Sequence, residues 1–178
     1  VLPAQYYTLA EAKELVEFCR ERHVLLIPEI DMPGHSRAFE KAFGTSMQTE
    51  AGISILKNLL DEVCETFSVP YIHIGTDEVA FTNPRFVPEM VQYLRDKGKK
   101  VISWNPGWQY QAGQIDMTQL WSYRGKAQKG IPAIDCRFHY LNHYDAFADL
   151  IALYNSRILN VEQGDDDHAG AIIAIWND

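Results

Sequence analysis

Two neighbouring carboxylic acids, Asp77 and Glu78, follow a short apolar run in the stretch YIHIGTDEV, residues 71–79. Adjacent acids can serve acid–base chemistry, because two close carboxylates push their proton affinities apart and one of them then stays protonated near neutral pH. Consecutive side chains of a regular strand point to opposite faces, so both acids can face one pocket only where the chain bends. Gly75 permits such a bend. Taken alone, an Asp-Glu pair after a strand more often marks a helix N-terminus, where acids complement the helix dipole.

Other polar and aromatic residues also follow apolar runs, as the two acids do. Each lies at or just beyond the C-terminal end of an apolar run that we expect to be a strand: Glu29, Asp31, Trp104, Trp121, Tyr140 and Trp176. In a (β/α)8 barrel the loops after the strands build the active-site face. One tryptophan at such a position is more often a core residue, but three at successive strand ends indicate a shared pocket that stacks on an apolar ligand face.

The elements that position these residues alternate regularly along the chain. Strands are expected at 24–31, 71–75, 100–104, 117–121, 133–138 and 171–176. Helices are expected after a capping box at Thr8 to Glu11, over 51–67, from Pro84 (with Asn83 as N-cap) to Gly98, near 124–130 and over roughly 145–155. This alternation predicts a parallel α/β fold, either doubly wound or a barrel.

The missing phosphate loop favours the barrel. A doubly wound sheet often carries a glycine-rich loop after its first strand, and no such motif occurs in this sequence. A closed barrel needs eight strands, so we expect residues 1–178 to form one partial (β/α)8 TIM-type barrel domain with strands three to eight. The first two strands and the last helix are then expected from a longer chain.

Composition restricts the class of partner. The chain has 178 residues, 47% of them hydrophobic and 22% charged, which is typical of a folded domain. A net charge of −8 with scattered basic residues argues against a nucleic acid or an anionic membrane as the main partner. We expect the three cysteines to be buried free thiols, and no residue pattern of a catalytic zinc or other metal site is evident.

Several motifs together resemble glycoside hydrolase family 20. They are LIPEIDMPGHS (26–36), YIHIGTDEV (71–79), the tryptophans that end three later strands, and YLN (140–142). The family contains the β-N-acetylhexosaminidases, and the similarity spans nearly the whole chain. It implies hydrolysis of terminal non-reducing β-linked N-acetylglucosamine or N-acetylgalactosamine, with a carbohydrate substrate, no cofactor, and a secreted, periplasmic or lysosomal location.

The resemblance also implies a role for individual residues. Family 20 is a substrate-assisted exception among glycosidases, because the 2-acetamido oxygen of the substrate is the nucleophile. Glu78 is then the general acid and later the base, Asp77 holds the acetamido N–H, and Tyr140 donates to the acetamido oxygen. The remaining implied substrate-binding residues are Asp31, His35, Trp104, Trp121, Asn142, Trp176 and Asp178.

Three residues depart from the family pattern. Thr76 replaces the second of two glycines before Asp-Glu, Asn142 stands for an aspartate, and Asp178 stands for a glutamate. These changes leave alternatives open: a catalytically silent carbohydrate-binding relative, or a family-20 enzyme that releases a disaccharide or acts on a sulfated amino sugar. A further alternative is a structural fragment without an independent fold.

Overall fold

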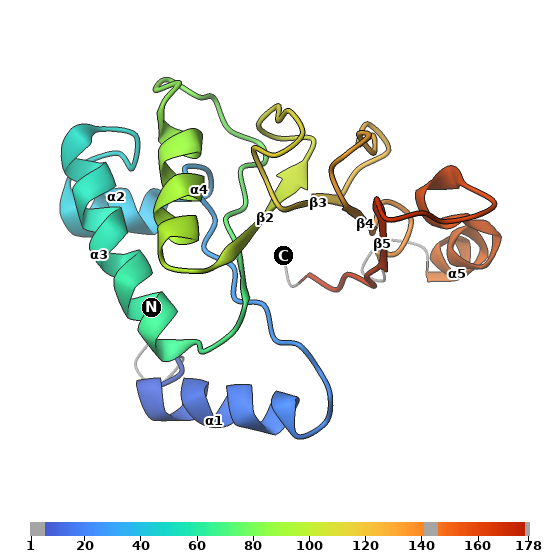
Figure 1. Cartoon of the computed structure of the whole chain (residues 1–178), viewed down its shortest axis with the longest axis horizontal. Coiled ribbons are helices and arrows are strands. Elements are labelled where there is room, and N and C mark those ends of the chain that lie inside the picture. The colour runs from blue at the N-terminus through green and yellow to red at the C-terminus, as the bar shows by residue number, and fades with distance from the viewer. Residues whose placement is uncertain (1–5, 141–145, 177–178) are drawn as a thin grey trace. The chain divides into compact units, whose positions relative to one another are not determined.

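The computed structural model describes residues 6–140 and 146–176 (Figure 1). Its elements, in chain order, are α1 (Leu9–Arg20), α2 (Arg37–Phe43), α3 (Glu50–Thr66), β1 (Tyr71–His73), α4 (Phe86–Asp96), β2 (Lys100–Asn105), β3 (Met117–Leu120), β4 (Ala133–Asp135), α5 (Ala146–Asn155), the 3-10 helix η1 (Ile158–Asn160) and β5 (His168–Ala171). Among the described residues, no helix combines the length and the apolar character that crossing a membrane demands.

The chain separates into two compact units, which are described here one at a time. The first unit comprises residues 1–73 and 80–101, and the second comprises residues 74–79 and 102–178. The first therefore holds the helices α1 to α4, whereas the second holds the turn with Asp77 and Glu78 together with the strands that follow β2.

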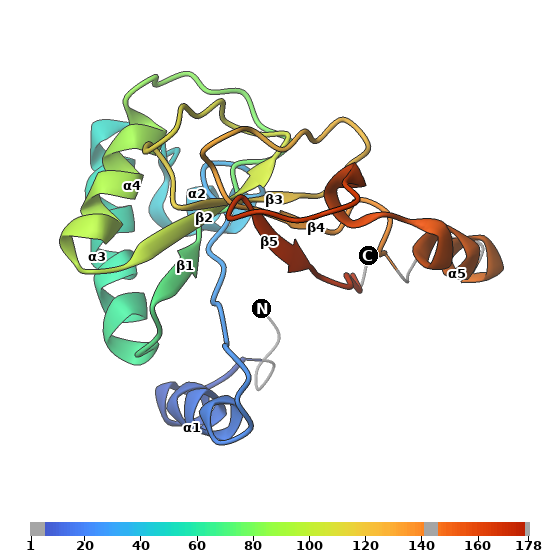
Figure 2. The same ribbon diagram turned by 45° about the vertical axis from the view of Figure 1, so that its right-hand side comes forward.

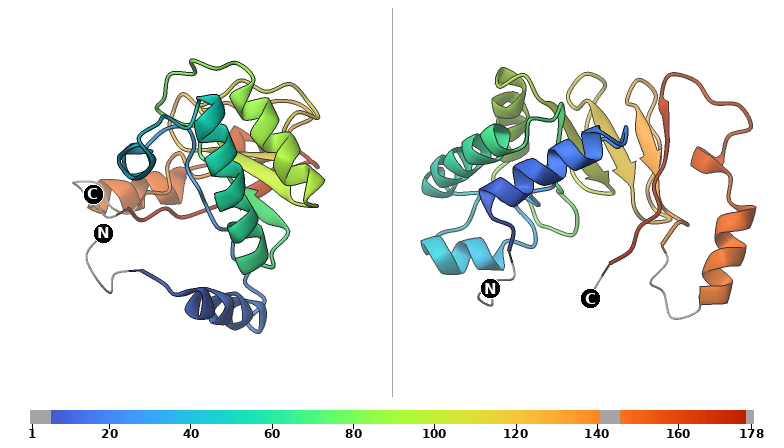
Figure 3. Two further views of the ribbon diagram at one scale, coloured as in Figure 1. Left: turned by 90° about the vertical axis from the view of Figure 1, so that its left-hand side faces the viewer. Right: turned by 90° about the horizontal axis from the view of Figure 1, so that it is seen from below.

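Local sequence signals explain the helices of the first unit. In α1 the Thr8 side chain accepts from the Glu11 N–H while the Glu11 carboxylate accepts from the Thr8 N–H, which confirms the predicted capping box. The Thr49 side chain caps α3 by accepting from the Gly52 N–H. Helices α3 and α4 pack side by side (Figure 3) and bury an apolar interface that includes Leu56, Leu60, Phe86, Met90 and Leu94, each 0% exposed.

The strands form one sheet in the order β1-β2-β3-β4-β5. In the second unit β3, β4 and β5 lie side by side (Figure 2). Their pairing is parallel, with Thr118 opposite Ala133 and Asp135 opposite Ala171. The carboxyl ends of parallel strands meet at one edge, so this register brings residues that follow β2, β3 and β4 to the same side of the sheet. Leu120 of β3, Ala133 of β4 and Leu159 of η1 form a buried apolar cluster.

The segment 24–31 is not the strand that its apolar run predicts. Only Glu29 pairs, in a parallel bridge with His73, and Val24 and Leu25 are 55% and 52% exposed. Around the bridge, Ile30 N–H donates to His73 O and His73 N–H donates to Pro28 O. Pro28 itself has no N–H to donate, so it cannot extend a two-sided ladder toward Val24.

One predicted helix is absent, and the predicted start of α4 and end of the last strand are wrong. No helix forms near 124–130, because Gly125 packs closely against Asn105 and the Asn105 side chain donates to the Lys126 carbonyl. Helix α4 begins after Arg85, and Asn83 instead accepts the Arg85 N–H in a preceding turn. The last strand ends at Ala171, beyond which the extended chain keeps only an isolated bridge, Tyr140 to Ala174.

The observed architecture is thus a parallel α/β fold with a five-stranded sheet. The strands expected near 71, 100, 117 and 133 and the helix expected near 145–155 are present. All three cysteines are free, as predicted, but only Cys136 is buried, while Cys19 and Cys64 are partly exposed.

Candidate active site

The turn that carries the two acids has an unusual backbone. Gly75, Thr76 and Glu78 have φ values of +68°, +84° and +48°, so the chain bends sharply directly after β1, where the sequence predicts a bend. Glycine adopts this region freely, whereas a β-branched residue there is an outlier with a cost of about 1–3 kcal/mol. Asp77 is half-buried and Glu78 is exposed, so both lie outside the packed sheet.

Strand β2 holds this turn by backbone hydrogen bonds. Ile74 N–H donates to Ile102 O at 2.9 Å, and Trp104 N–H donates to Gly75 O at 2.8 Å. Ser103, the β2 residue between these two partners, adds a side-chain contact from its hydroxyl to the Thr76 hydroxyl at 3.2 Å. The turn is therefore fixed to residues 102–104, the part of β2 that belongs to the second unit, through both backbone and side-chain atoms.

Tyr140 lies in the electrostatic field of this turn. Burial raises the pKa of the Tyr140 hydroxyl well above its usual value; the neighbouring Cys136 raises the pKa further, and the negative charge of Asp77 adds a smaller increase. A hydrogen bond from Trp176 lowers the pKa of Tyr140, but it offsets only part of this increase. The hydroxyl therefore keeps its proton over the physiological range and can donate it to a ligand. The Cys136 thiol, which donates to Leu120 O, lies 3.9 Å from the Tyr140 oxygen.

Of the three predicted tryptophans, Trp104 and Trp176 form a ring pair, and Trp121 is held separately. The rings of Trp104 and Trp176 lie with centroids 6.1 Å apart and planes tilted by 55°. Trp104 is 5% exposed, whereas Trp176 is 46% exposed and presents ring surface to solvent. Trp121 is half-buried, and its indole N–H donates to Pro106 O at 2.8 Å, which fixes the ring beside the loop after β2. Trp104, Trp176 and Tyr140 are thus brought together with Asp77 in the second unit.

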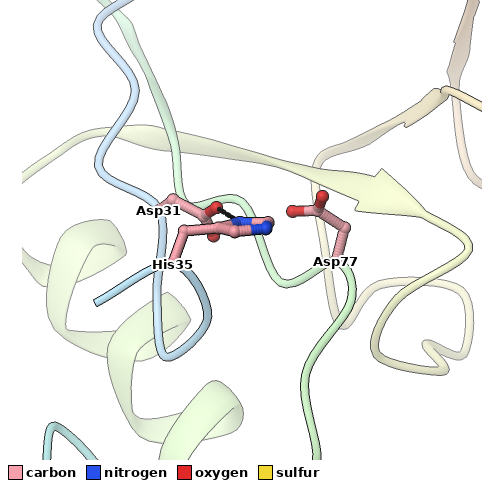
Figure 4. A group of neighbouring side chains, drawn as sticks. All are labelled: Asp31, His35 and Asp77. Atoms are coloured by element: carbon pink, nitrogen blue, oxygen red, sulfur yellow. Dashed lines mark hydrogen bonds and ion pairs between the residues drawn. The ribbon is translucent and has the colours of Figure 1, made fainter. Parts of the chain in front are cut away.

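Asp31 and His35 form a pair in the first unit (Figure 4). His35 Nδ1 and Asp31 Oδ2 are 2.5 Å apart, and His35 has a φ of +47°. A carboxylate on one ring nitrogen fixes the orientation and tautomer of an imidazole. The sequence motif that places these residues four positions apart therefore produces a defined acid–imidazole pair.

His73, on β1, is buried beside Glu29. Its side chain is 4% exposed, with Nδ1 at 3.6 Å from Glu29 Oε1. Burial lowers the pKa of His73 to about 3, so the imidazole is neutral at pH 7 and the contact with Glu29 is not an ion pair there. His73 thus packs within the fold.

Two of the predicted site residues, Asn142 and Asp178, lie outside the described residues. The sequence interpretation, in turn, missed the groups that support the acid-bearing turn: Ser103, Gly107 and Tyr110. A signal for Ser103 was present, because a serine within the buried strand KVISW needs a hydrogen-bond partner. Gly107 and Tyr110 lie in the loop after β2, where no motif marks them.

A polar network at the end of β4 was also missed. Asp135 and Arg137 form a buried salt bridge, with Arg137 Nη2 at 2.8 Å from Asp135 Oδ2 and side chains that are 7% and 1% exposed for Arg137 and Asp135. Asp135 Oδ2 also accepts the Leu159 N–H at 2.7 Å. This network connects the loop that leads to Tyr140 with η1.

Known proteins resemble the chain in both sequence and structure. The family model described as glycosyl hydrolase family 20, catalytic domain, matches residues 2–84. A β-N-acetylhexosaminidase of Cellulomonas fimi is 30% identical over 127 residues, which cover 57% of this chain and 26% of that protein. The curated relatives are much longer, and this chain spans 16% to 26% of the length of those compared.

Two solved structures extend the comparison. The β-N-acetylhexosaminidase of Bacteroides fragilis matches with a TM-score of 0.78 and 25% identity, over 96% of this chain and 46% of that one. A variant of the Streptomyces plicatus β-hexosaminidase in complex with its product GlcNAc matches with a TM-score of 0.60 and 25% identity, over 76% of this chain and 34% of that one. The chain is therefore similar, in sequence over residues 2–84 and in structure over most of its length, to part of the catalytic domain of glycosyl hydrolase family 20.

Proposed function

We propose that this chain supplies the acid–base and acetamido-binding groups of an exo-acting β-N-acetylhexosaminidase. The substrate is a terminal, non-reducing β-linked N-acetylglucosamine or N-acetylgalactosamine, and the anomeric configuration is retained. The observation that carries the proposal is the clustering of a bent Asp77–Glu78 turn, a protonated Tyr140 and the Trp104–Trp176 pair in one unit. Segment 24–31, with its Glu29 bridge, and the five strands β1 to β5 then represent strands three to eight of a (β/α)8 barrel.

Glu78 is the proton carrier of the proposed mechanism. In the first step its carboxylic acid protonates the leaving glycosidic oxygen while the substrate's acetamido oxygen attacks the anomeric carbon. The bond to the leaving group breaks, and a bicyclic oxazolinium ion forms. In the second step the Glu78 carboxylate takes a proton from water, which attacks the anomeric carbon and restores the acetamido group. The exposed position of Glu78 is compatible with access of both the aglycone and water.

Asp77 and Tyr140 orient the nucleophile. The Asp77 carboxylate accepts from the acetamido N–H and stabilises the positive charge that develops on the oxazolinium. Tyr140 donates its hydroxyl proton to the acetamido oxygen, a role for which a raised pKa is suited because the hydroxyl stays protonated. The two groups are proposed to hold one acetamido group, Asp77 at its N–H and Tyr140 at its oxygen.

The aromatic side chains form the walls of the proposed subsite. Trp104 and Trp176, tilted by 55° to each other, provide two faces of an apolar corner that suits the acetamido methyl group. Exclusion of water there protects the oxazolinium from hydrolysis before the aglycone departs. Trp121 is held by Pro106 O and offers a further stacking surface.

The proposal also assigns roles to residues that the structure does not place in this cluster. By family resemblance, Asp31 and His35 tune the proton affinity of Glu78, and their short mutual hydrogen bond supports a fixed pair. Asn142 and Asp178, outside the described residues, are proposed to bind distal sugar hydroxyls. This substrate-assisted chemistry requires no metal or cofactor.

The test compares hydrolysis of a chromogenic β-N-acetylglucosaminide by the full-length protein and by two variants. Glu78→Gln keeps the size of the side chain but removes the transferable proton, so kcat should fall by about 10²- to 10⁴-fold. Glu65→Gln makes the same chemical change on the exposed face of α3 and serves as the matched control. Equal rates for wild type and Glu78→Gln would overturn the assignment of Glu78.

The substrate range separates the proposal from its alternatives. The corresponding β-glucoside lacks the acetamido group and should not be cleaved. A sulfated or disaccharide substrate cleaved in preference to the simple glycoside would indicate a different specificity within the family. Binding of N-acetylglucosamine without hydrolysis of any amino sugar would indicate a carbohydrate-binding relative.

A further inference from the structure

Thr76 occupies a backbone conformation that glycine adopts far more easily. Its φ is +84°, and its side chain is fully buried. A β-branched residue persists in such a conformation only where its surroundings hold it there. The contacts that hold Thr76 therefore also determine the geometry of the next two residues, Asp77 and Glu78.

The hydroxyl of Thr76 belongs to a small buried polar cluster. Its oxygen lies 3.2 Å from the hydroxyl oxygen of Ser103, which is itself 0% exposed. The Tyr110 hydroxyl is also buried and has no hydrogen-bond partner among the described residues; burial raises its pKa to about 12, and the nearby Ser103 and Thr76 side chains lower it in part. All three hydroxyls stay protonated at physiological pH, and Thr76 Oγ1 anchors the turn to β2 within this cluster.

The backbone of Thr76 is also closely approached by Gly107. A Cβ atom built on Gly107 would lie 2.7 Å from Thr76 O and 2.9 Å from Thr76 Oγ1, distances that real side chains do not reach. The loop after β2 thus approaches the carbonyl and the hydroxyl of Thr76 as closely as only glycine allows. The Ser103 hydroxyl and the Gly107 backbone together leave the Thr76 side chain little freedom.

We propose that Thr76 is a positioning residue for the catalytic acids. Its hydroxyl bond to Ser103 holds the 75–78 turn in the conformation that directs Asp77 and Glu78 to the substrate, a task that glycine could perform only through its backbone. Thr76 does not touch the substrate and acts through the two acids. This inference rests on the proposed function of Asp77 and Glu78.

The test uses three threonine variants in the full-length protein. Thr76→Val keeps the branched shape and removes the hydroxyl, and Thr76→Ser keeps the hydroxyl and removes the methyl group. Thr118→Val is the matched control, because Thr118 is also buried on a neighbouring strand of the same unit, and its hydroxyl has no hydrogen-bond partner among the described residues. Initial rates on the chromogenic β-N-acetylglucosaminide give kcat and KM for each variant.

Thr76→Val should lower kcat by about 10- to 100-fold with little change in KM, because misalignment affects the transition state more than substrate binding. Thr76→Ser should restore most of kcat, and Thr118→Val should match wild type. Ser103→Ala should reproduce the loss seen in Thr76→Val, and combining the two should add little more, since both remove the same bond. The inference would be overturned if Thr76→Val kept the wild-type kcat. It would also be overturned if Thr76→Ser or Thr118→Val lost as much kcat as Thr76→Val.

A second measurement separates this inference from the proposed function. Amide hydrogen exchange of residues 74–80 should become faster in Thr76→Val and stay unchanged in Thr118→Val, whether or not the protein hydrolyses an amino sugar. A wild type without hydrolysis would contradict the proposed function alone. Unchanged exchange in Thr76→Val would contradict the positioning role alone.

Discussion

Removal of the Asp135 carboxylate should strongly destabilise the protein. This side chain is 1% exposed and accepts four hydrogen bonds: from Arg137 N–H at 3.1 Å, Arg137 Nε at 2.9 Å, Arg137 Nη2 at 2.8 Å and Leu159 N–H at 2.7 Å. Asp135→Ala leaves the Arg137 guanidinium buried without its counter-ion and the Leu159 N–H without an acceptor. Both losses follow from one substitution.

The expected size of this effect comes from the burial of the pair. Breaking a buried ion pair by removing one partner costs about 3–5 kcal/mol, because an uncompensated charge stays in the interior. An exposed pair of the same chemistry, such as Arg157 with Glu162, contributes about 0–1 kcal/mol. Asp135→Ala should therefore lower the free energy of unfolding by about 3–5 kcal/mol.

The pH dependence of this loss has a definite sign. Burial alone raises the pKa of Asp135, but the hydrogen bonds from Arg137 and Leu159 outweigh it and bring the pKa below its usual value. A carboxylate with a lowered pKa stabilises the fold above its unfolded pKa, and this contribution is lost as the pH falls through the folded pKa. The difference between wild type and Asp135→Ala should therefore shrink in acid.

Urea unfolding of the full-length protein, followed by circular dichroism at pH 7 and at several pH values below the ordinary aspartate pKa of 3.8, measures both effects. Asp166→Ala is the control, since Asp166 is an exposed aspartate and its loss should change stability by less than about 0.5 kcal/mol. Removing both charges in Asp135→Ala with Arg137→Ala should cost less than the sum of the single losses. If the free energy of unfolding of Asp135→Ala lies within about 1 kcal/mol of the wild-type value, the reasoning is refuted, because a loss that small is typical of an exposed ion pair.

Three further predictions concern His73, Tyr140 and Gly107. Because burial lowers the pKa of His73 to about 3, the unfolded chain binds this proton first, and stability should fall by up to about 1.4 kcal/mol per pH unit below pH 6.5. His73→Gln should show a weaker acid dependence in urea titrations, and an unchanged slope would contradict the burial argument. Tyr140→Phe should lower kcat by about 10²- to 10³-fold, as for loss of one transition-state donor, and a loss below threefold would contradict its role. Gly107→Ala should cost about 1–3 kcal/mol in urea titrations, because its Cβ would lie 2.6 Å from Trp104 O, whereas Gly164→Ala, with ordinary contacts, should be neutral. Equal stability of the two alanine variants would contradict the close approach at Gly107.

The sequence predicts those elements whose local signals agree with their packing. The capping box at Thr8 specifies the start of α1, and the apolar spacing of residues 51–67 specifies α3 to within a residue at each end. The segment 24–31 shows where such signals fail, because an apolar run indicates burial of side chains but not the presence of a backbone partner on either side. The sequence itself contains Pro28, and because proline has no N–H to donate, it argues against a central strand over this segment.

The candidate site was predictable as a set of residues, but its support was not. Asp77, Glu78, Trp104, Tyr140 and Trp176 all carry sequence signals, since each follows an apolar run or a motif. The sequence also marked Thr76 as a departure from the family pattern. Its positive φ depends on atoms that are close only in three dimensions, the Ser103 hydroxyl and the Gly107 backbone among them, and single-sequence patterns do not contain such contacts.

The most direct test of the central claim measures inhibition by a thiazoline that mimics the oxazolinium ion. If Asp77 and Tyr140 hold the substrate's acetamido group as the nucleophile, the full-length protein should bind this mimic at least about 100-fold more tightly than N-acetylglucosamine, as expected for an analogue of a high-energy species. Inhibition no stronger than that by N-acetylglucosamine, in a protein that cleaves the β-N-acetylglucosaminide, would contradict participation of the acetamido group.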